Sequence, residues 1–284
     1  MQPLVDADVL VYEIGFASET GWKAVKEWKE GDAPLDPPPF DYVAELLDNR
    51  IADICGTVMA TEPPILYLTG AGNFRENIGI TLPYKGNRDN LKKPWHYQNI
   101  KAYMMTRYHT LVIDGKEADD AMCIVQTQRL KDLSGSQYYL PETIICTRDK
   151  DLRQCPGWHF GWELGNQPQF GPEFVEGYGY IKLNDKRNKI VGVGEKFFYS
   201  QLITGDKVDN IPGLPSSGPV AAFELLESTT TPEEGFKCVV EAYRAKFPET
   251  WKEYLLEQGQ LLWMVRELDE EGKPIMWRMP DVQN

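Results

Sequence analysis

Two aspartates, Asp206 and Asp209, lie three residues apart and lead directly into a turn rich in proline, glycine and serine, within the stretch GDKVDNIPGLPSSGP (205–219). An Asp-x-x-Asp pair before such a turn is common, and taken alone it is typical of a solvated helix end. Carboxylates also bind divalent cations and transfer protons. Which role applies here depends on the other acids that the fold brings near this pair.

Three further acidic clusters follow short apolar segments that have the pattern of buried strands. These acids are Asp6, then Glu117, Asp119 and Asp120, then Asp149 and Asp151. The segments before them are residues 3–8, 110–114 and 143–149. Because the carboxyl ends of parallel strands meet at one edge of a sheet, we expect the three clusters to share a crevice. Asp206 and Asp209 would reach it from a helical region. A solvated turn explains any one cluster, but explains the set poorly.

Eight carboxylates in one crevice repel one another, and their removal from water adds to that cost. Divalent cations offset both terms. Mg²⁺ prefers oxygen ligands, and two ions about 3.5–4 Å apart clamp the attacking and leaving oxygens of a phosphodiester. With only three histidines and no Cys-x-x-Cys pair, the chain does not predict a zinc site. We therefore predict two Mg²⁺ ions, which Mn²⁺ can replace.

The elements that must position these acids alternate between strands and helices. Apolar spacings of three and four predict helices over residues 42–59 and 118–133, and an apolar run predicts a strand over 64–69. The residues after the first strand predict a helix to about residue 28. Residues 157–182 predict irregular β structure, and the hydrophobic pattern is helical from about residue 193 to the end. This order predicts an α/β fold: a central, mostly parallel sheet with helices on both faces (residues 1–192) and a helical C-terminal subdomain (193–284).

The formal net charge of −13 argues at first against a nucleic-acid partner, but the charge is unevenly distributed. Between Lys85 and Arg107 six basic residues accompany one acid, Asp89, and a second basic stretch runs from Lys182 to Lys196. A solvated basic face is an equally simple interpretation of each stretch. The chain has no apolar run long enough to cross a membrane and no signal-peptide pattern. Its five scattered cysteines predict reduced thiols in a cytoplasmic protein.

The acidic clusters and the motifs between them occur in an order that resembles one family. After Asp6 come YKGNR (84–88), GKEADD (115–120), TRDKD (147–151) and the stretch that begins at Gly205. This order resembles the 5′-nuclease superfamily, which includes flap endonucleases and the 5′ nuclease domain of bacterial repair polymerases. It looks most similar to the bacteriophage 5′→3′ exonucleases. Each motif alone is weak, but together they span residues 4–226 and are specific.

The resemblance implies a role for each acid. The implied ligands of the first metal are Asp6, Glu117 and Asp119, with Asp120 nearby. Those of the second are Asp149, Asp151 and Asp206, with Asp209 in an outer shell. The core would be the PIN-like fold of this family, and a phage protein of this kind would lie in the host cytoplasm.

The resemblance also implies DNA contacts beside the metals. Tyr84, Lys85 and Arg88 match the base of the family's helical arch, where a lysine and an arginine stabilise charge on the scissile phosphate. The arch would lie at about 71–100 and include Lys92 and Lys93. There, Trp95, His96 and Tyr97 either stack on splayed bases or pack on the sheet, and Phe74 with Arg75 either walls an end nucleotide or belongs to the core.

A helix–hairpin–helix at about 202–226 would hold duplex phosphates through backbone N–H groups, and its carbonyls would bind K⁺. Its hairpin residues would be Gly213, Leu214, Pro215, Ser216, Ser217 and Gly218. Two departures weaken this match: Ser216 stands where the family has a second glycine, and Val220 stands where a lysine often follows. A third departure is Gly70, where members of the family carry an aspartate after the second strand. Asp8, expected on the same side of an extended segment as Asp6, is the candidate to compensate.

The sequence thus predicts a metal-dependent 5′→3′ exonuclease or flap endonuclease. Its substrates would be the 5′ ends of duplex or flapped DNA and the RNA of RNA–DNA hybrids, in phage replication, recombination or primer removal, with replication proteins as possible partners. One alternative is a phosphatase of the haloacid-dehalogenase type, with Asp6 as nucleophile and Asp8 as acid and base. The other is a relative that binds DNA structures but has lost catalysis. The reason to consider it is that Gly70 replaces an aspartate of the family.

Overall fold

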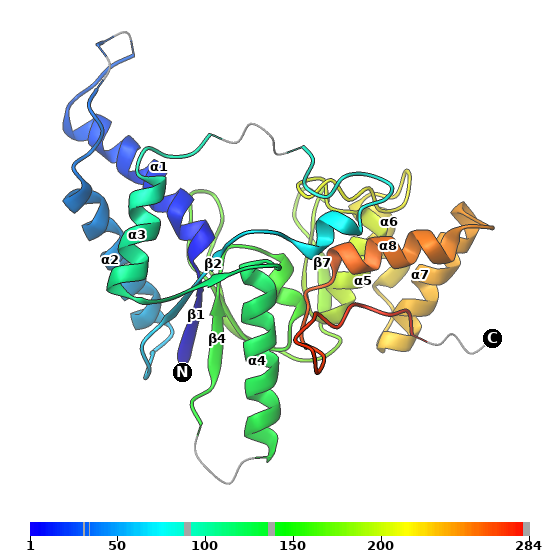
Figure 1. Cartoon of the computed structure of the whole chain (residues 1–284). Coiled ribbons are helices and arrows are strands. Elements are labelled where there is room, and N and C mark those ends of the chain that lie inside the picture. The colour runs from blue at the N-terminus through cyan, green and yellow to red at the C-terminus, as the bar shows by residue number, and fades with distance from the viewer. Residues whose placement is uncertain (31, 34, 88–91, 136–139, 281–284) are drawn as a thin grey trace.

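The computed structural model describes residues 1–30, 32–33, 35–87, 92–135 and 140–280. Their main sheet has six strands in the order β3-β2-β1-β4-β5-β6. The strands are β1 (Gln2–Asp6), β2 (Ile65–Thr69), β3 (His109–Ile113), β4 (Thr143–Cys146), β5 (Gly157–Gly161) and β6 (Phe170–Val175). The first five are parallel, and β6 runs antiparallel to β5. Figure 1 shows helices on both faces of this sheet, which confirms the predicted α/β architecture.

Three helices cover one face of the sheet and one covers the other (Figure 1). The first three are α1 (Ala7–Val25), α2 (Phe40–Thr57) and α3 (Tyr97–Arg107), and the fourth is α4 (Ala118–Gly135). The alternation of side chains along a strand separates the two cores. On β1, Val5 packs with the α1–α3 layer and Leu4 with α4. The strand order reverses at β1, whose neighbours are β2 and β4, and ligands bind at such a switch point in open α/β sheets.

The C-terminal part is mainly helical and has its own apolar core. Its elements are the hairpin strands β7 (Tyr180–Leu183) and β8 (Ile190–Val193) and the helices α5 (Gly194–Thr204), α6 (Pro219–Leu226), α7 (Pro232–Lys246) and α8 (Trp251–Leu262). Phe198, Tyr199 and Tyr243 are completely buried there. The helical pattern predicted to the end of the chain is wrong beyond Leu262: residues 263–280 have no helix, and Trp277 packs against Gly259 of α8.

Two local expectations are wrong. Asp8 does not continue an extended segment with Asp6, because Asp6 caps α1 through Val9 N–H and Asp8 lies in the first helical turn. Cys123 and Cys155 are paired as a disulfide rather than both reduced, because α4 packs beside the end of η2 (Asp151–Gln154). Cys55, Cys146 and Cys238 are free thiols.

The stretch expected to form a helical arch holds little helix in the part that the structure describes. Residues 74–77 form the 3₁₀ helix η1 (Phe74–Asn77), residues 78–87 are turns, and α3 begins only at Tyr97. Pro83 and Pro94 disfavour helix there. Figure 1 shows η1 beside α8 and residues 92–96 beside α1, with residues 88–91 outside the description.

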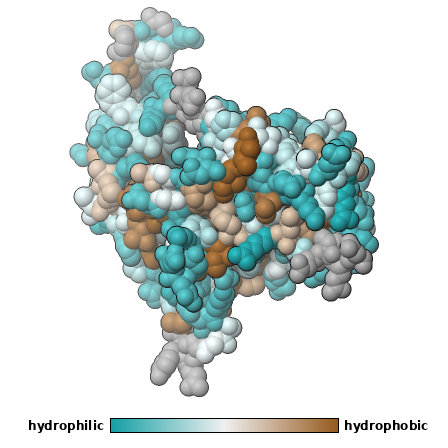
Figure 2. All heavy atoms as spheres, turned by 45° about the vertical axis from the view of Figure 1, so that its right-hand side comes forward, coloured by the Kyte–Doolittle hydropathy of each residue, from teal (hydrophilic) through white to brown (hydrophobic). Residues whose placement is uncertain are grey.

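The surface is mainly polar on the face drawn in Figure 2, where apolar residues form separate small patches. Among the described helices, none is both long and apolar enough to cross a membrane.

Candidate active site

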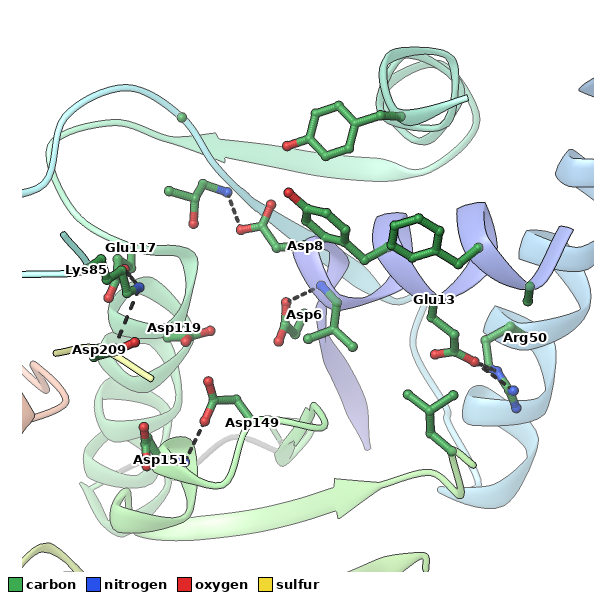
Figure 3. A pocket seen from close by; sticks show the side chains of 18 of the residues that line it. Asp6, Asp8, Glu13, Arg50, Lys85, Glu117, Asp119, Asp149, Asp151 and Asp209 are labelled. Atoms are coloured by element: carbon green, nitrogen blue, oxygen red, sulfur yellow. Dashed lines mark hydrogen bonds and ion pairs between the residues drawn. The ribbon is translucent and has the colours of Figure 1, made fainter. Parts of the chain in front are cut away.

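A cavity of about 1070 Å³ lies at the carboxyl edge of the main sheet, and acids from several elements line it. Its acidic residues include Asp6, Asp8, Glu117, Asp119, Asp149, Asp151 and Asp209. Figure 3 shows Asp6 and Asp8 on one side of the opening, Glu117 and Asp119 across from them, and Asp149 and Asp151 below. The predicted crevice is therefore present, with acids from the end of β1, the start of α4 and the segment after β4.

Thr147 was not predicted as a site residue, but it joins the first and third acidic clusters. Its hydroxyl donates to Asp6 Oδ2 at 2.7 Å and accepts the backbone N–H of Asp149 at 2.9 Å. Asp149 Oδ1 in turn accepts the backbone N–H of Asp151 at 2.8 Å. These bonds fix the directions of two carboxylates from neighbouring strands, which pre-organises the edge of the cavity.

Two lysines neutralise part of the acidic charge. Lys85 Nζ forms an ion pair with Glu117 and lies 4.0 Å from Asp209 Oδ2. Lys150 Nζ bridges Asp151 Oδ1 at 2.7 Å and Asp206 Oδ2 at 2.6 Å. Asp206 is paired with Lys150 and is not among the residues that line the cavity.

Tyr84 and Lys85 bring the turn at 83–87 against the stretch at 206–210. The Tyr84 hydroxyl donates to Glu117 at 3.0 Å and to Asp209 at 3.1 Å. The backbone N–H of Lys85 donates to the carbonyl of Asp209 at 3.0 Å, and Asn210 Nδ2 donates to the carbonyl of Pro83 at 2.9 Å. Two segments more than 100 residues apart in sequence therefore form one rim of the cavity.

The remaining acids are partly or fully removed from water, and this has an electrostatic cost. Burial, together with the charge of Asp8, raises the pKa of Asp6 to about 6. Burial and the charge of Asp151 raise the pKa of Asp149 to about 7, and burial with the charge of Asp6 raises that of Asp119 well above its usual range. Burial also acts to raise the pKa of Glu117, but the charges of Lys85 and Arg75 outweigh it and lower that pKa.

The donor set fits a divalent cation, because every ligand group around the cavity is an oxygen and several carry uncompensated charge. In the part of the chain that the structure describes, no three of these side chains converge closely enough to hold an ion as they stand. Lys85 and Lys150 lie among the carboxylates instead. The metal assignments therefore remain predictions.

Asp120 departs from the predicted metal set. It is fully buried and does not line the cavity. Both of its oxygens accept from the Arg75 guanidinium, at 2.6 and 2.8 Å, and Oδ1 also accepts the N–H of Val265 at 3.0 Å. Arg75 donates further to the carbonyls of Leu261 at 3.1 Å and Trp263 at 2.6 Å. Of the two interpretations of Arg75, the geometry therefore supports a place in the core rather than in a wall for an end nucleotide.

The basic residues of the expected arch lie away from the acids. Lys92 and Lys93 line a smaller cavity of about 190 Å³ with Trp22 and Trp95, and Arg88 is outside the described residues. Trp95 is 70% exposed, whereas His96 is buried and bonds to the carbonyl of Pro38 at 2.8 Å. Of the three residues at 95–97, Trp95 is the exposed one.

The expected hairpin, Gly213 to Gly218, joins α5 to α6. Gly213 and Ser216 have φ values of 63° and 60°, so the turn uses the left-handed region twice. The N–H of Gly213 donates to Gln258 at 3.0 Å and that of Leu214 to the carbonyl of Ile203 at 2.9 Å. Those two N–H groups hold the turn to its own subdomain, and phosphate or K⁺ binding there stays a prediction.

Known proteins give the family context. No protein-family model matches the chain. A DNA polymerase I of Rhizobium leguminosarum is 33% identical over 188 residues, which are 64% of this chain and 16% of the polymerase. The flap endonuclease Xni of Shewanella halifaxensis is 27% identical over 129 residues, 45% of this chain and 44% of that protein.

A solved structure extends this likeness to nearly the whole chain. It is the flap endonuclease of bacteriophage T5 in a pseudo-enzyme-product complex with DNA and metal ions. The match has a TM-score of 0.52 and 15% identity, and covers 92% of this chain and 98% of that one. The chain resembles the 5′-nuclease superfamily in sequence and in fold.

The chain corresponds to only part of the length of these curated relatives. The chain spans 16% and 44% of the two curated relatives described above. At 15% identity the T5 structure establishes the shared fold, and its DNA and metal ions belong to that protein.

Proposed function

We propose that the protein is a metal-dependent 5′ nuclease that hydrolyses phosphodiester bonds at the 5′ ends of duplex or flapped DNA. The observation that supports this most directly is the set of buried acids at the carboxyl edge of a 5′-nuclease fold. Asp6, Asp119 and Asp149 carry raised pKa values there, and within the described chain none forms an ion pair with a lysine or arginine. A site of this kind gains free energy when cations replace the missing positive charge.

Two bound divalent cations, with Mg²⁺ as the expected ion, would supply Lewis-acid stabilisation of the attacking and leaving oxygens. The proposed ligands of the first are Asp6, Glu117 and Asp119. Those of the second are Asp149, Asp151 and Asp206, with Asp209 outside them. Asp120 is proposed to support Glu117 from behind, because the same Arg75 guanidinium contacts both, at 2.6 Å and 3.5 Å.

Lys85 is the proposed electrophilic residue of the chain itself. Its side chain is 27% exposed at the rim of the cavity, where a scissile phosphate would lie between it and the carboxylates. Its ammonium would stabilise the charge that develops on the phosphate, and Tyr84 would hold Glu117 and Asp209 in place. Arg88 is proposed to stabilise charge on the same phosphate, as the family resemblance implies.

We further propose that residues 1–192 form the catalytic core and that 193–284 bind duplex DNA through the hairpin at 213–218, with K⁺ on its carbonyls. Action on the RNA of RNA–DNA hybrids and a place in phage replication belong to the same proposal. Lys92 and Lys93 would add phosphate contacts beside the exposed Trp95.

The test uses a 5′-labelled duplex and a 5′-flap duplex, each incubated with Mg²⁺, Mn²⁺ or EDTA. Metal-dependent products from the labelled end are expected, and their lengths separate exonuclease from flap cleavage. Asp149→Asn is the matched inactive control, since it removes one proposed ligand while keeping the hydrogen bond to Asp151. Binding of the flap without any product in Mg²⁺ or Mn²⁺ would identify a DNA-structure-binding protein instead.

A further inference from the structure

The end of strand β2 contributes no acid to the cavity, and a side chain at the position after it would have to displace that of Asp114. Gly70 follows β2 directly, and a Cβ at this position would lie 2.1 Å from Asp114 Oδ1 and 3.0 Å from the carbonyl oxygen of Ile113. Asp114 is held there because its Oδ1 accepts the N–H of Ala71 at 2.7 Å. It is exposed and does not line the cavity.

An acid from a different element reaches the same place. Asp8 lies in the first turn of α1, and its Oδ2 accepts the N–H of Thr69, the last residue of β2, at 2.8 Å. Figure 3 shows the Asp8 carboxylate beside that of Asp6, facing the open space across which Glu117 lies. This hydrogen bond therefore holds the carboxylate of Asp8, which belongs to α1, at the end of β2, where Gly70 has no side chain.

Asp8 lines the same cavity as Asp6, Glu117 and Asp119. Burial raises the pKa of Asp8, and the charge of Glu117 raises it further, while Lys101 and the bond to Thr69 act in the opposite direction. The charge of Asp8 in turn raises the pKa of Asp6. Asp6, Asp8 and Glu117 therefore face the same part of the cavity, where their oxygens are available to a cation.

We propose that Asp8 is a ligand of the first metal, and that in this chain α1 supplies the carboxylate that the end of β2 lacks. The proposal rests on the proposed function, since it assigns one more ligand to the same cation site. Asp6, Asp8, Glu117 and Asp119 would then surround the first divalent cation from β1, α1 and the start of α4. A site with four carboxylates suits a hard cation with oxygen ligands.

The test is the affinity of the protein for Mn²⁺ alone, without DNA, measured from the free-ion electron paramagnetic resonance signal or by calorimetry. The variant is Asp8→Asn, which keeps an oxygen acceptor for Thr69 N–H. We expect its tighter Mn²⁺ site to weaken at least about tenfold, the scale on which metal sites respond to loss of a supporting group. The matched control is Asp114→Asn, which we expect to change the affinity less than about threefold.

The outcomes separate this inference from the proposed function. Wild-type protein that binds Mn²⁺ and cleaves DNA, with Asp8→Asn binding within threefold of it, overturns the inference alone. A larger loss in Asp114→Asn than in Asp8→Asn also overturns it, because the compensating acid is then Asp114. Wild-type protein that neither binds Mn²⁺ nor cleaves overturns both. If thermal melting shows that Asp8→Asn is unfolded, Asp8→Ser, which retains a short acceptor, takes its place.

Discussion

Asp149→Asn should stabilise the metal-free protein while it weakens metal binding at the proposed second site. In the folded chain, burial and the charge of Asp151 raise the pKa of Asp149 from 3.8 to about 7. Between these two values the folded state binds more protons than the unfolded state, so stability falls as the pH rises through this window. Above pH 7 the wild-type protein carries the full cost of an ionised Asp149, and asparagine carries none of it.

The magnitude follows from the pKa shift. One pKa unit corresponds to about 1.4 kcal/mol, so a rise from 3.8 to about 7 sets an upper limit of about 4 kcal/mol. Asparagine keeps the acceptor for Asp151 N–H but adds an amide that needs its own partner. A gain of about 2 kcal/mol at pH 8 is therefore expected, and almost none at pH 4, where the wild-type carboxyl is already protonated.

Urea unfolding of both proteins in EDTA at pH 4 and pH 8 measures this difference, and the same titrations in Mg²⁺ measure the metal effect. Mg²⁺ should stabilise the wild-type protein more than Asp149→Asn, which keeps only the proposed first site, because only ligand bound to the native state adds stability. The reasoning is refuted if Asp149→Asn is less stable than wild type at pH 8 in EDTA, or if Mg²⁺ stabilises both equally.

Three other expectations test separate parts of the site. Arg75→Met should lower the free energy of unfolding by about 3–5 kcal/mol, because it leaves Asp120 buried without a counter-charge. The control Lys131→Met removes an ion pair with Glu267 in which both side chains are at least half exposed, and it should cost about 1 kcal/mol or less. Equal losses in urea titrations would contradict the core role of Arg75. Lys85→Ala should reduce kcat for a flap substrate about 100-fold with little change in DNA affinity, and a change confined to Kd would make Lys85 a positioning contact. The shift in Tm that Mg²⁺ causes should become smaller as the pH falls below about 7. Protons compete with the cation for Asp149 first and then, near pH 6, for Asp6. A constant shift in Tm down to pH 5 would exclude these acids as ligands.

Much of the fold was predictable because its signals are local. The apolar segment before Asp6 and the one before Asp149 are buried strands, and the three-and-four spacing from Val43 to Val58 is the buried face of α2. Acids that follow parallel strands must lie at one edge of the sheet. The shared cavity of Asp6, Asp119 and Asp149 therefore required only the order of the strands.

The partners of the acids were not predictable, because they depend on contacts between distant segments. Arg75 and Asp120 are 45 residues apart, and their bonds to Leu261, Trp263 and Val265 involve the far end of the chain. The helix that carries Asp8 did have a local signal. Asp6 is a good N-cap residue, and Leu10, Val11 and Ile14 after it have helical spacing.

Two lysines offset part of the repulsion among the clustered acids. Glu117 and Asp206 are matched by Lys85 and Lys150, and in both cases the lysine's charge outweighs burial and lowers the pKa of the acid. Asp6, Asp119 and Asp149 keep raised pKa values. The free energy available for binding cations is therefore concentrated in this second group. In the first site one proposed ligand, Glu117, is paired with a lysine, whereas in the second site Lys150 pairs with both Asp151 and Asp206, so the second site should bind more weakly than the first.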